Sequence, residues 1–106
     1  MKFERLFMIP GNEDVWLDCY LNDPIPGFTR KAILVIPGGG YWGVCSDREG
    51  EPIAMAFAAR GMAAFVLHYS VKEQAAGFRP LTEAFLAVAY IVVSRRSLTF
   101  GREWAE

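Results

Sequence analysis

Histidine and cysteine are scarce in these 106 residues, and neither sign of charge predominates. One histidine and two cysteines, without the spacing of metal ligands, predict neither a metal centre nor a disulfide framework, so both thiols are expected to be reduced. Eleven basic and twelve acidic residues give a net charge of −1, which excludes the basic footprint of a nucleic-acid-binding or membrane-surface protein. The longest apolar run, residues 84–93, is half of the roughly 20 residues that span a bilayer, so no transmembrane helix is predicted.

The N-terminal segment also lacks the apolar stretch of a secretory signal peptide. Glu4 and Arg5 occupy positions where that stretch would lie, so a cytoplasmic location is expected. Hydrophobic residues make up 53% of the chain and charged residues 22%, which is typical of a packed domain rather than a disordered segment. The length favours a single domain.

The first part of the chain has the pattern of two strands. Residues 15–20 alternate with a period of two, which predicts a strand with one face more buried than the other. Residues 3–9 predict an earlier strand, separated from it by a turn at residues 10–12 (PGN). The two strands are expected to form an antiparallel hairpin within residues 3–21, followed by a loop over residues 22–29.

Two continuous apolar runs, residues 31–36 (KAILVI) and 62–69 (MAAFVLHY), predict buried parallel strands. Between them, residues 51–60 predict a helix, with Pro52 in its first turn and Gly61 beyond its end. Strand, helix and strand in this order predict a right-handed βαβ unit. Residues 80–96 predict a further helix, apolar nearly all round, which indicates burial beneath more protein than these residues supply.

A run of glycines follows the first buried strand, in residues 37–42 (PGGGYW). Open α/β sheets place their ligand sites at this edge, where parallel strands end. Glycines carry no side chain to block approach, so such a loop can direct backbone N–H groups toward a substrate oxygen. The pattern fits an oxyanion hole, and on the glycines alone a tight strand-to-helix turn without a ligand is an equal alternative.

The segments IPGGGY, SDREGEPIA and FAARGMAAFVLHYSV, within residues 32–71, resemble the acetyl-esterase and xylan-esterase branch of the α/β-hydrolases. The resemblance continues through residues 78–91. It implies an α/β fold class: a partial α/β-hydrolase fold in which the antiparallel hairpin leads into a mostly parallel sheet with flanking helices. It further implies a carboxylic-ester hydrolase of the esterase or lipase type, without a cofactor, for a small-molecule short-chain acyl or acetyl ester, including esters on carbohydrate.

By this resemblance, the backbone N–H groups of Gly39 and Gly40 would stabilise the tetrahedral oxyanion. Tyr41 and Trp42 would line the acyl or alcohol pocket. Pro37 stands where other members have the histidine of the HGGG-type motif.

The segment that starts the first helix is expected to be structural. Its residues Ser46 and Asp47 are candidates to cap the N–H groups at the helix start. The remaining serines, Ser70, Ser94 and Ser97, lack the flanking glycines of an activated nucleophile and are interpreted as ordinary polar residues.

The G-x-S-x-G nucleophile elbow of this family does not occur in the sequence. The family order is serine, acid, histidine, so all three triad residues would lie beyond residue 106, and the isolated chain is expected to be inactive. Three explanations for the missing nucleophile stay open. The chain is a fragment, its sequence after about Val92 is frame-shifted or divergent, or it is a pseudoenzyme. The domain organisation expected is one α/β-hydrolase domain with a hairpin and loop (1–30), a βαβ unit with the oxyanion loop (31–71), a helix (80–96) and a divergent tail (97–106).

Two alternatives belong to other functional classes. The chain fits a non-catalytic interaction module that self-associates through an exposed sheet edge and the apolar final helix. Gly38, Gly40 and Gly43 also satisfy the G-x-G-x-x-G pattern of dinucleotide binding. This second alternative is weaker, because the acidic residue expected about 20 positions later is missing where the second strand ends in His68 and Tyr69.

His68, the only histidine, is expected to be a hydrogen-bonded core or cleft residue rather than a base. A cysteine hydrolase would need His68 within hydrogen-bond reach of Cys45, which the sequence does not indicate.

Overall fold

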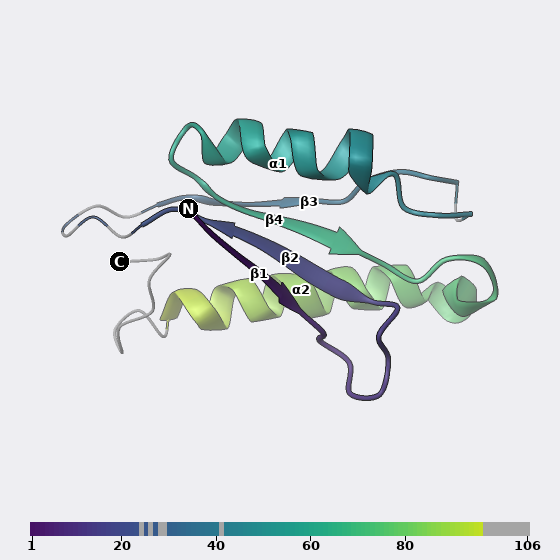
Figure 1. Cartoon of the computed structure of the whole chain (residues 1–106). Coiled ribbons are helices and arrows are strands. Elements are labelled where there is room, and N and C mark those ends of the chain that lie inside the picture. Colours follow the sequence, from purple (N-terminus) through teal and green to yellow (C-terminus); the bar gives the residue numbers. More distant parts are fainter. Residues whose placement is uncertain (24, 26, 28–29, 41, 97–106) are drawn as a thin grey trace.

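The computed structural model describes residues 1–23, 25, 27, 30–40 and 42–96. Within this described part, a four-stranded sheet lies between two α-helices (Figure 1). The strands are β1 (Lys2–Leu6), β2 (Trp16–Leu21), β3 (Ala32–Val35) and β4 (Ala63–His68), and the helices are α1 (Glu51–Ala58) and α2 (Arg79–Arg96). A π-helical turn, η1 (Ser46–Gly50), precedes α1, and a 3-10 segment, η2 (Lys72–Phe78), precedes α2.

The sheet has the strand order β1-β2-β4-β3. Strands β1 and β2 pair antiparallel, with Glu4 opposite Cys19, which confirms the predicted hairpin. Strands β3 and β4 pair in parallel, with Leu34 opposite Phe65, as predicted for the βαβ unit. Strand β4 also pairs antiparallel with β2, so the hairpin and the parallel pair form one mixed sheet. This is the partial α/β fold that the sequence predicts.

Alternate residues of β4 enter two hydrophobic cores, one on each face of the sheet. Phe65 and Leu67 belong to the core that includes Ala87 of α2. Val66 belongs to the core that includes Ala54 of α1. Because a helix covers each face, the strand must be apolar on both sides, which explains its continuous hydrophobic run.

Strand β2 differs from its prediction, because it is buried on both faces. Asp18 is only 7% exposed, and its carboxylate accepts hydrogen bonds from Arg5 Nε at 2.7 Å and Nη2 at 3.1 Å. The ring of Tyr20 is covered by Phe3, with 5.2 Å between ring centroids. Cross-strand partners on β1 therefore bury positions that alternation alone assigns to solvent.

Both predicted helices form, but the start of α1 differs from expectation. Pro52 lies in its first turn as predicted, and Gly61, with a φ of 86°, lies beyond its end. The residue at its N-cap is Gly50, and the cap has no side-chain hydrogen bond. Capping by Ser46 or Asp47 is therefore wrong, since both residues belong to the separate turn η1.

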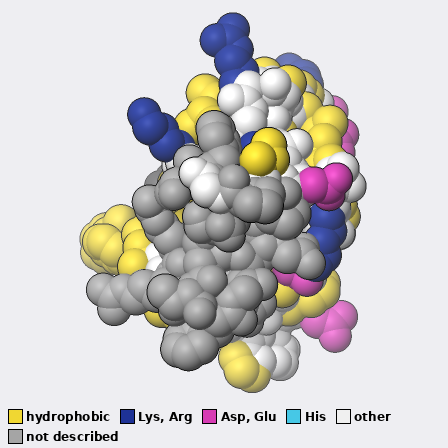
Figure 2. All heavy atoms as spheres, turned by 90° about the vertical axis from the view of Figure 1, so that its left-hand side faces the viewer, with side chains coloured by type: hydrophobic (Ala, Val, Ile, Leu, Met, Phe, Trp, Pro, Cys, Tyr) yellow, Lys and Arg dark blue, Asp and Glu magenta, His cyan; other side chains and the backbone are white. Residues whose placement is uncertain are grey.

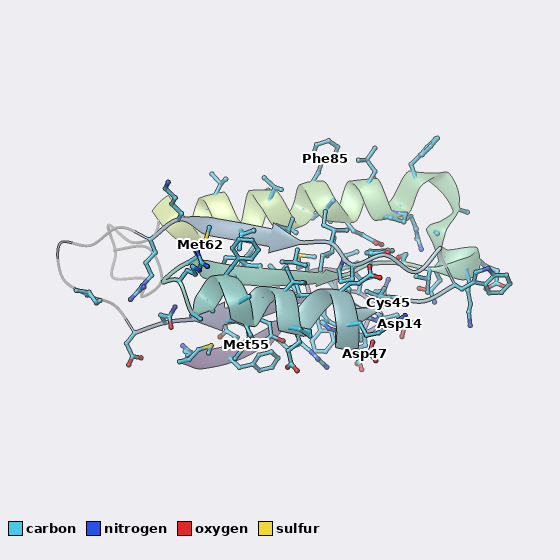
Figure 3. The ribbon with its side chains drawn as sticks, turned by 90° about the horizontal axis from the view of Figure 1, so that it is seen from above. Asp14, Cys45, Asp47, Met55, Met62 and Phe85 are labelled. Carbon is cyan, nitrogen blue, oxygen red and sulfur yellow. The ribbon has the colours of Figure 1, made fainter. Side chains whose placement is uncertain are left out.

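Helix α2 covers one face of the sheet, and its outer side is apolar and exposed. Phe85 is 67% exposed and points away from the sheet (Figure 3). The other exposed large hydrophobic residues of this helix are Leu81, Leu86, Val88, Val92 and Val93. The sequence predicts such an outer side for a helix that is apolar nearly all round.

By length and composition alone, Lys72–Val93 is long and apolar enough to cross a membrane. The segment is not one continuous helix, because Gly77, with a φ of 71°, interrupts it between η2 and α2. Ala87 and Ile91 also pack into the core under the sheet. These features are those of a kinked segment with one side against the sheet.

The charge on the end of the molecule shown in Figure 2 is mixed. Basic side chains lie at the top and left of that view and also at its right, where they are next to acidic ones. Among the described side chains on this face, no continuous patch of one charge forms.

Candidate functional site

A cavity of about 460 Å³ lies beside the loop that follows β3. Three segments line it: this loop, the residue after β4, and the first turns of α2. The lining residues are Ile36, Pro37, Gly38, Gly39, Gly40, Tyr69, Pro80, Leu81 and Ala84. Because the loop and Tyr69 follow the carboxyl ends of two parallel strands, the cavity occupies the usual ligand position of an α/β sheet.

The glycine loop uses its carbonyl groups for hydrogen bonds within the loop. The Cys45 N–H donates to the Gly38 carbonyl at 2.9 Å, and the Trp42 N–H donates to the Gly39 carbonyl at 3.1 Å. In a trans peptide the C=O and N–H groups point in opposite directions, so the N–H groups of Gly39 and Gly40 point away from these bonds. Neither N–H has a hydrogen-bond partner among the residues that the structure describes.

Glycine is required at residue 39 by a close approach of backbone. A Cβ atom at Gly39 would lie 1.9 Å from the Gly43 carbonyl oxygen and 2.8 Å from its carbon. Gly40 has a φ of 61°, in the left-handed region that favours glycine. The two candidate oxyanion donors thus lie on backbone that other residues would distort.

Two side chains that sequence reasoning missed contact this loop. The Tyr69 hydroxyl donates to the Pro37 carbonyl oxygen at 2.5 Å. Glu49 Oε1 accepts a hydrogen bond from the Gly38 N–H at 2.8 Å. The only sequence signals were a tyrosine directly after a buried strand and an acid in the turn before α1.

A buried carboxylate joins α2 to the end of β4. Glu83 is 2% exposed, and its carboxylate accepts hydrogen bonds from the Ser70 N–H at 2.7 Å and from the Ser70 hydroxyl. These bonds replace the water that a buried carboxylate loses. Ser70, expected to be an ordinary polar residue, therefore helps to hold the first turns of α2 beside the cavity.

Of the two aromatic residues expected in the pocket, the structure describes only Trp42. Trp42 is 78% exposed and does not line the described cavity. Tyr41 lies outside the described residues, as does Ser97. Substrate contact by Tyr41 and Trp42 stays a prediction.

His68 and Cys45 contact different groups. The His68 ring stacks on Trp16, with 3.8 Å between centroids, and its Nδ1 lies 3.1 Å from the Asp14 carbonyl oxygen. Cys45 Sγ lies 3.7 Å from Arg48 Nη2. Within the described contacts, the pairing that a cysteine hydrolase needs is not formed.

Both cysteines are free thiols. Burial raises the pKa of the Cys19 thiol to about 12, which keeps it protonated and suits packing rather than nucleophilic attack. No group of three or more His, Cys, Asp and Glu side chains that could hold a metal ion occurs in the part of the chain described.

Known protein structures superpose on this arrangement of sheet and helices. An alpha/beta hydrolase enzyme from a Medee basin deep-sea metagenome library is 39% identical and superposes with a TM-score of 0.79, covering 92% of this chain and 40% of that one. The chain carries part of the α/β-hydrolase fold. The resemblance to α/β-hydrolases that residues 32–71 and 78–91 carry is thereby confirmed. No family model matches the sequence.

Two further proteins are similar to this α/β-hydrolase segment. The acetyl ester-xyloside bifunctional hydrolase from Caldicellulosiruptor lactoaceticus is 25% identical, with a TM-score of 0.71, over 89% of this chain and 36% of that one. Endo-1,4-beta-xylanase B from Butyrivibrio fibrisolvens is 48% identical over 66 residues, which are 62% of this chain and 8% of that protein. The chain thus spans less than half the length of these relatives.

Proposed function

We propose that this chain supplies the oxyanion-hole part of a carboxylic-ester hydrolase that cleaves short-chain acyl or acetyl esters, including esters carried on carbohydrate. The observation that carries the proposal is the pair of N–H groups at Gly39 and Gly40, which have no partner among the described residues and lie beside a cavity at the carboxyl ends of β3 and β4. Preorganised backbone donors of this kind stabilise the charge that develops on a carbonyl oxygen during acyl transfer. The acetyl-ester hydrolase among the relatives supports this choice of substrate.

The chemistry of the whole enzyme follows from the family mechanism. A serine attacks the ester carbonyl, a histidine takes its proton and passes it to the leaving alcohol, and an acid orients the histidine. Residues 1–106 contain no G-x-S-x-G segment, so in this proposal the triad is supplied by sequence other than these residues. The cavity between the glycine loop and α2 receives the acyl group.

We expect the isolated chain to hydrolyse p-nitrophenyl acetate no faster than buffer, because it has no activated nucleophile. A chimera that joins residues 1–91 to the following part of the deep-sea α/β hydrolase is expected to turn the ester over. It should also release a burst of p-nitrophenol as the serine is acylated. The absorbance of released p-nitrophenol measures the burst and the steady turnover of each protein.

The two proteins fail in different ways if the proposal is wrong. Turnover by the isolated chain would place a nucleophile within residues 1–106. A chimera that is folded by circular dichroism but inactive would contradict the assignment of these residues to an esterase.

We also propose that the isolated chain self-associates through the outer side of α2 and the outer edge of β3, which pairs only with β4 among the described strands. The exposed apolar residues of α2 favour this, because exposed apolar patches and unpaired strand edges bind other chains. Sedimentation velocity is expected to show oligomers that grow with concentration and decrease in a Phe85→Glu variant. The exposed loop residue Ile25 provides the control, Ile25→Glu. An unchanged monomer over the whole concentration range would refute this association.

A further inference from the structure

We propose that Tyr69 and Glu49 are positioning residues for the glycine loop. They hold one peptide unit of the loop from opposite sides and so fix the direction of the two candidate oxyanion donors. This inference rests on the proposed function, since it assigns a task to residues that would not touch the substrate carbonyl. Neither residue belongs to the triad or to the oxyanion hole of the proposed mechanism.

The two contacts meet on the same peptide group. The carbonyl oxygen of Pro37 and the N–H of Gly38 belong to the one peptide unit that joins these residues. Tyr69 donates to that carbonyl at 2.5 Å, and Glu49 accepts from that N–H at 2.8 Å. Because the two groups of a trans peptide point in opposite directions, one bond on each side prevents the plane from rotating about the chain.

Once the peptide plane between Pro37 and Gly38 is fixed, the orientation of the next peptide planes in the loop is restrained as well. Glycine has the widest choice of backbone angles, so three glycines in succession would otherwise leave the direction of their N–H groups undetermined. The Gly38 carbonyl is held next, by the Cys45 N–H, and the Gly39 carbonyl after it, by Trp42. Three consecutive peptide units are thus restrained, and the N–H groups of the second and third remain available.

The two positioning contacts differ in environment. Tyr69 is buried and comes from the segment after β4, where water competes little for its hydroxyl. Glu49 is exposed in η1, so water competes with its bond to the Gly38 N–H. We therefore expect the loop to depend more on Tyr69 than on Glu49.

Backbone amide NMR on the complete 106-residue chain tests the inference without any catalysis. Tyr69→Phe removes only the hydroxyl, and it is expected to shift or broaden the amide resonances of Gly38, Gly39 and Gly40. Tyr20→Phe is the matched control, because it removes a hydroxyl that contacts Glu51 at 3.4 Å, away from the loop. Identical glycine resonances in the two variants would overturn the role of Tyr69.

An exposed residue gives a second test that does not depend on core packing. Glu49→Ala is expected to speed hydrogen exchange at the Gly38 amide about tenfold, since that amide loses its partner. Glu49→Gln keeps an acceptor oxygen and should restore part of the protection, whereas the control Glu51→Ala should leave Gly38 unchanged. Exchange at Gly38 that is equal in all these variants would overturn the role of Glu49.

Kinetics of the esterase chimera separate this inference from the proposed function. Tyr69→Phe is expected to lower kcat about tenfold with little change in KM, because a misdirected donor weakens transition-state stabilisation more than substrate binding. A raised KM with an unchanged kcat would contradict a positioning role for Tyr69. A chimera without any activity would count against the proposed function only, because the glycine resonances and Gly38 exchange report the two contacts independently.

Discussion

Alanine at Gly39 is expected to lower the kcat of the esterase chimera by about 10²–10³-fold, the usual effect of losing one oxyanion donor. The added Cβ atom would lie 1.9 Å from the Gly43 carbonyl oxygen, which is backbone and can yield only if the loop moves. That movement turns the N–H groups of Gly39 and Gly40 away from the substrate oxygen. Steady-state hydrolysis of p-nitrophenyl acetate measures the loss.

Gly43→Ala provides the matched control in the same loop. A Cβ atom at Gly43 has no neighbour within 4 Å, so this variant is expected to keep its kcat within about twofold, as for a surface substitution. Equal losses in the two variants would show that the loop tolerates no side chain anywhere. An unaltered kcat in Gly39→Ala would exclude this segment of the loop as the oxyanion hole.

Alanine at Phe65 is expected to lower the free energy of unfolding of the chain by about 3–5 kcal/mol, as for other buried Phe→Ala changes. Phe65 is 1% exposed and sits at the centre of β4, in the core between the sheet and α2. A domain of this size is stable by only about 5–15 kcal/mol, so the loss is a large part of the total. Urea unfolding followed by circular dichroism gives the change.

Phe85→Ala is the control, because it removes the same aromatic ring from an exposed position. It therefore distinguishes the loss of core packing from the loss of a ring as such. Phe85 points away from the sheet on the outer side of α2, so at concentrations where sedimentation velocity shows a monomer Phe85→Ala is expected to change the free energy of unfolding by less than about 0.5 kcal/mol. A similar destabilisation by both variants in the monomer would contradict the outward position of Phe85.

The positions of the strands and of the glycine loop follow from the sequence, because local signals determine them. Two apolar runs, a glycine that ends the intervening helix and a proline in its first turn specify the βαβ unit. The glycines come directly after the first run, and parallel strands bring their carboxyl ends to one edge. The resemblance of residues 32–71 to esterases adds the function expected of this loop.

The side chains that position the loop were decided only by tertiary structure. Tyr69 is separated from its acceptor residue by 32 positions and Glu49 from its donor residue by 11, and neither spacing has a sequence signature. Asp18 and Glu83 look like surface carboxylates in the sequence, yet both are buried. The physical reason is the same in each case: a buried polar group is stable only beside its partner, and folding alone brings the partners together.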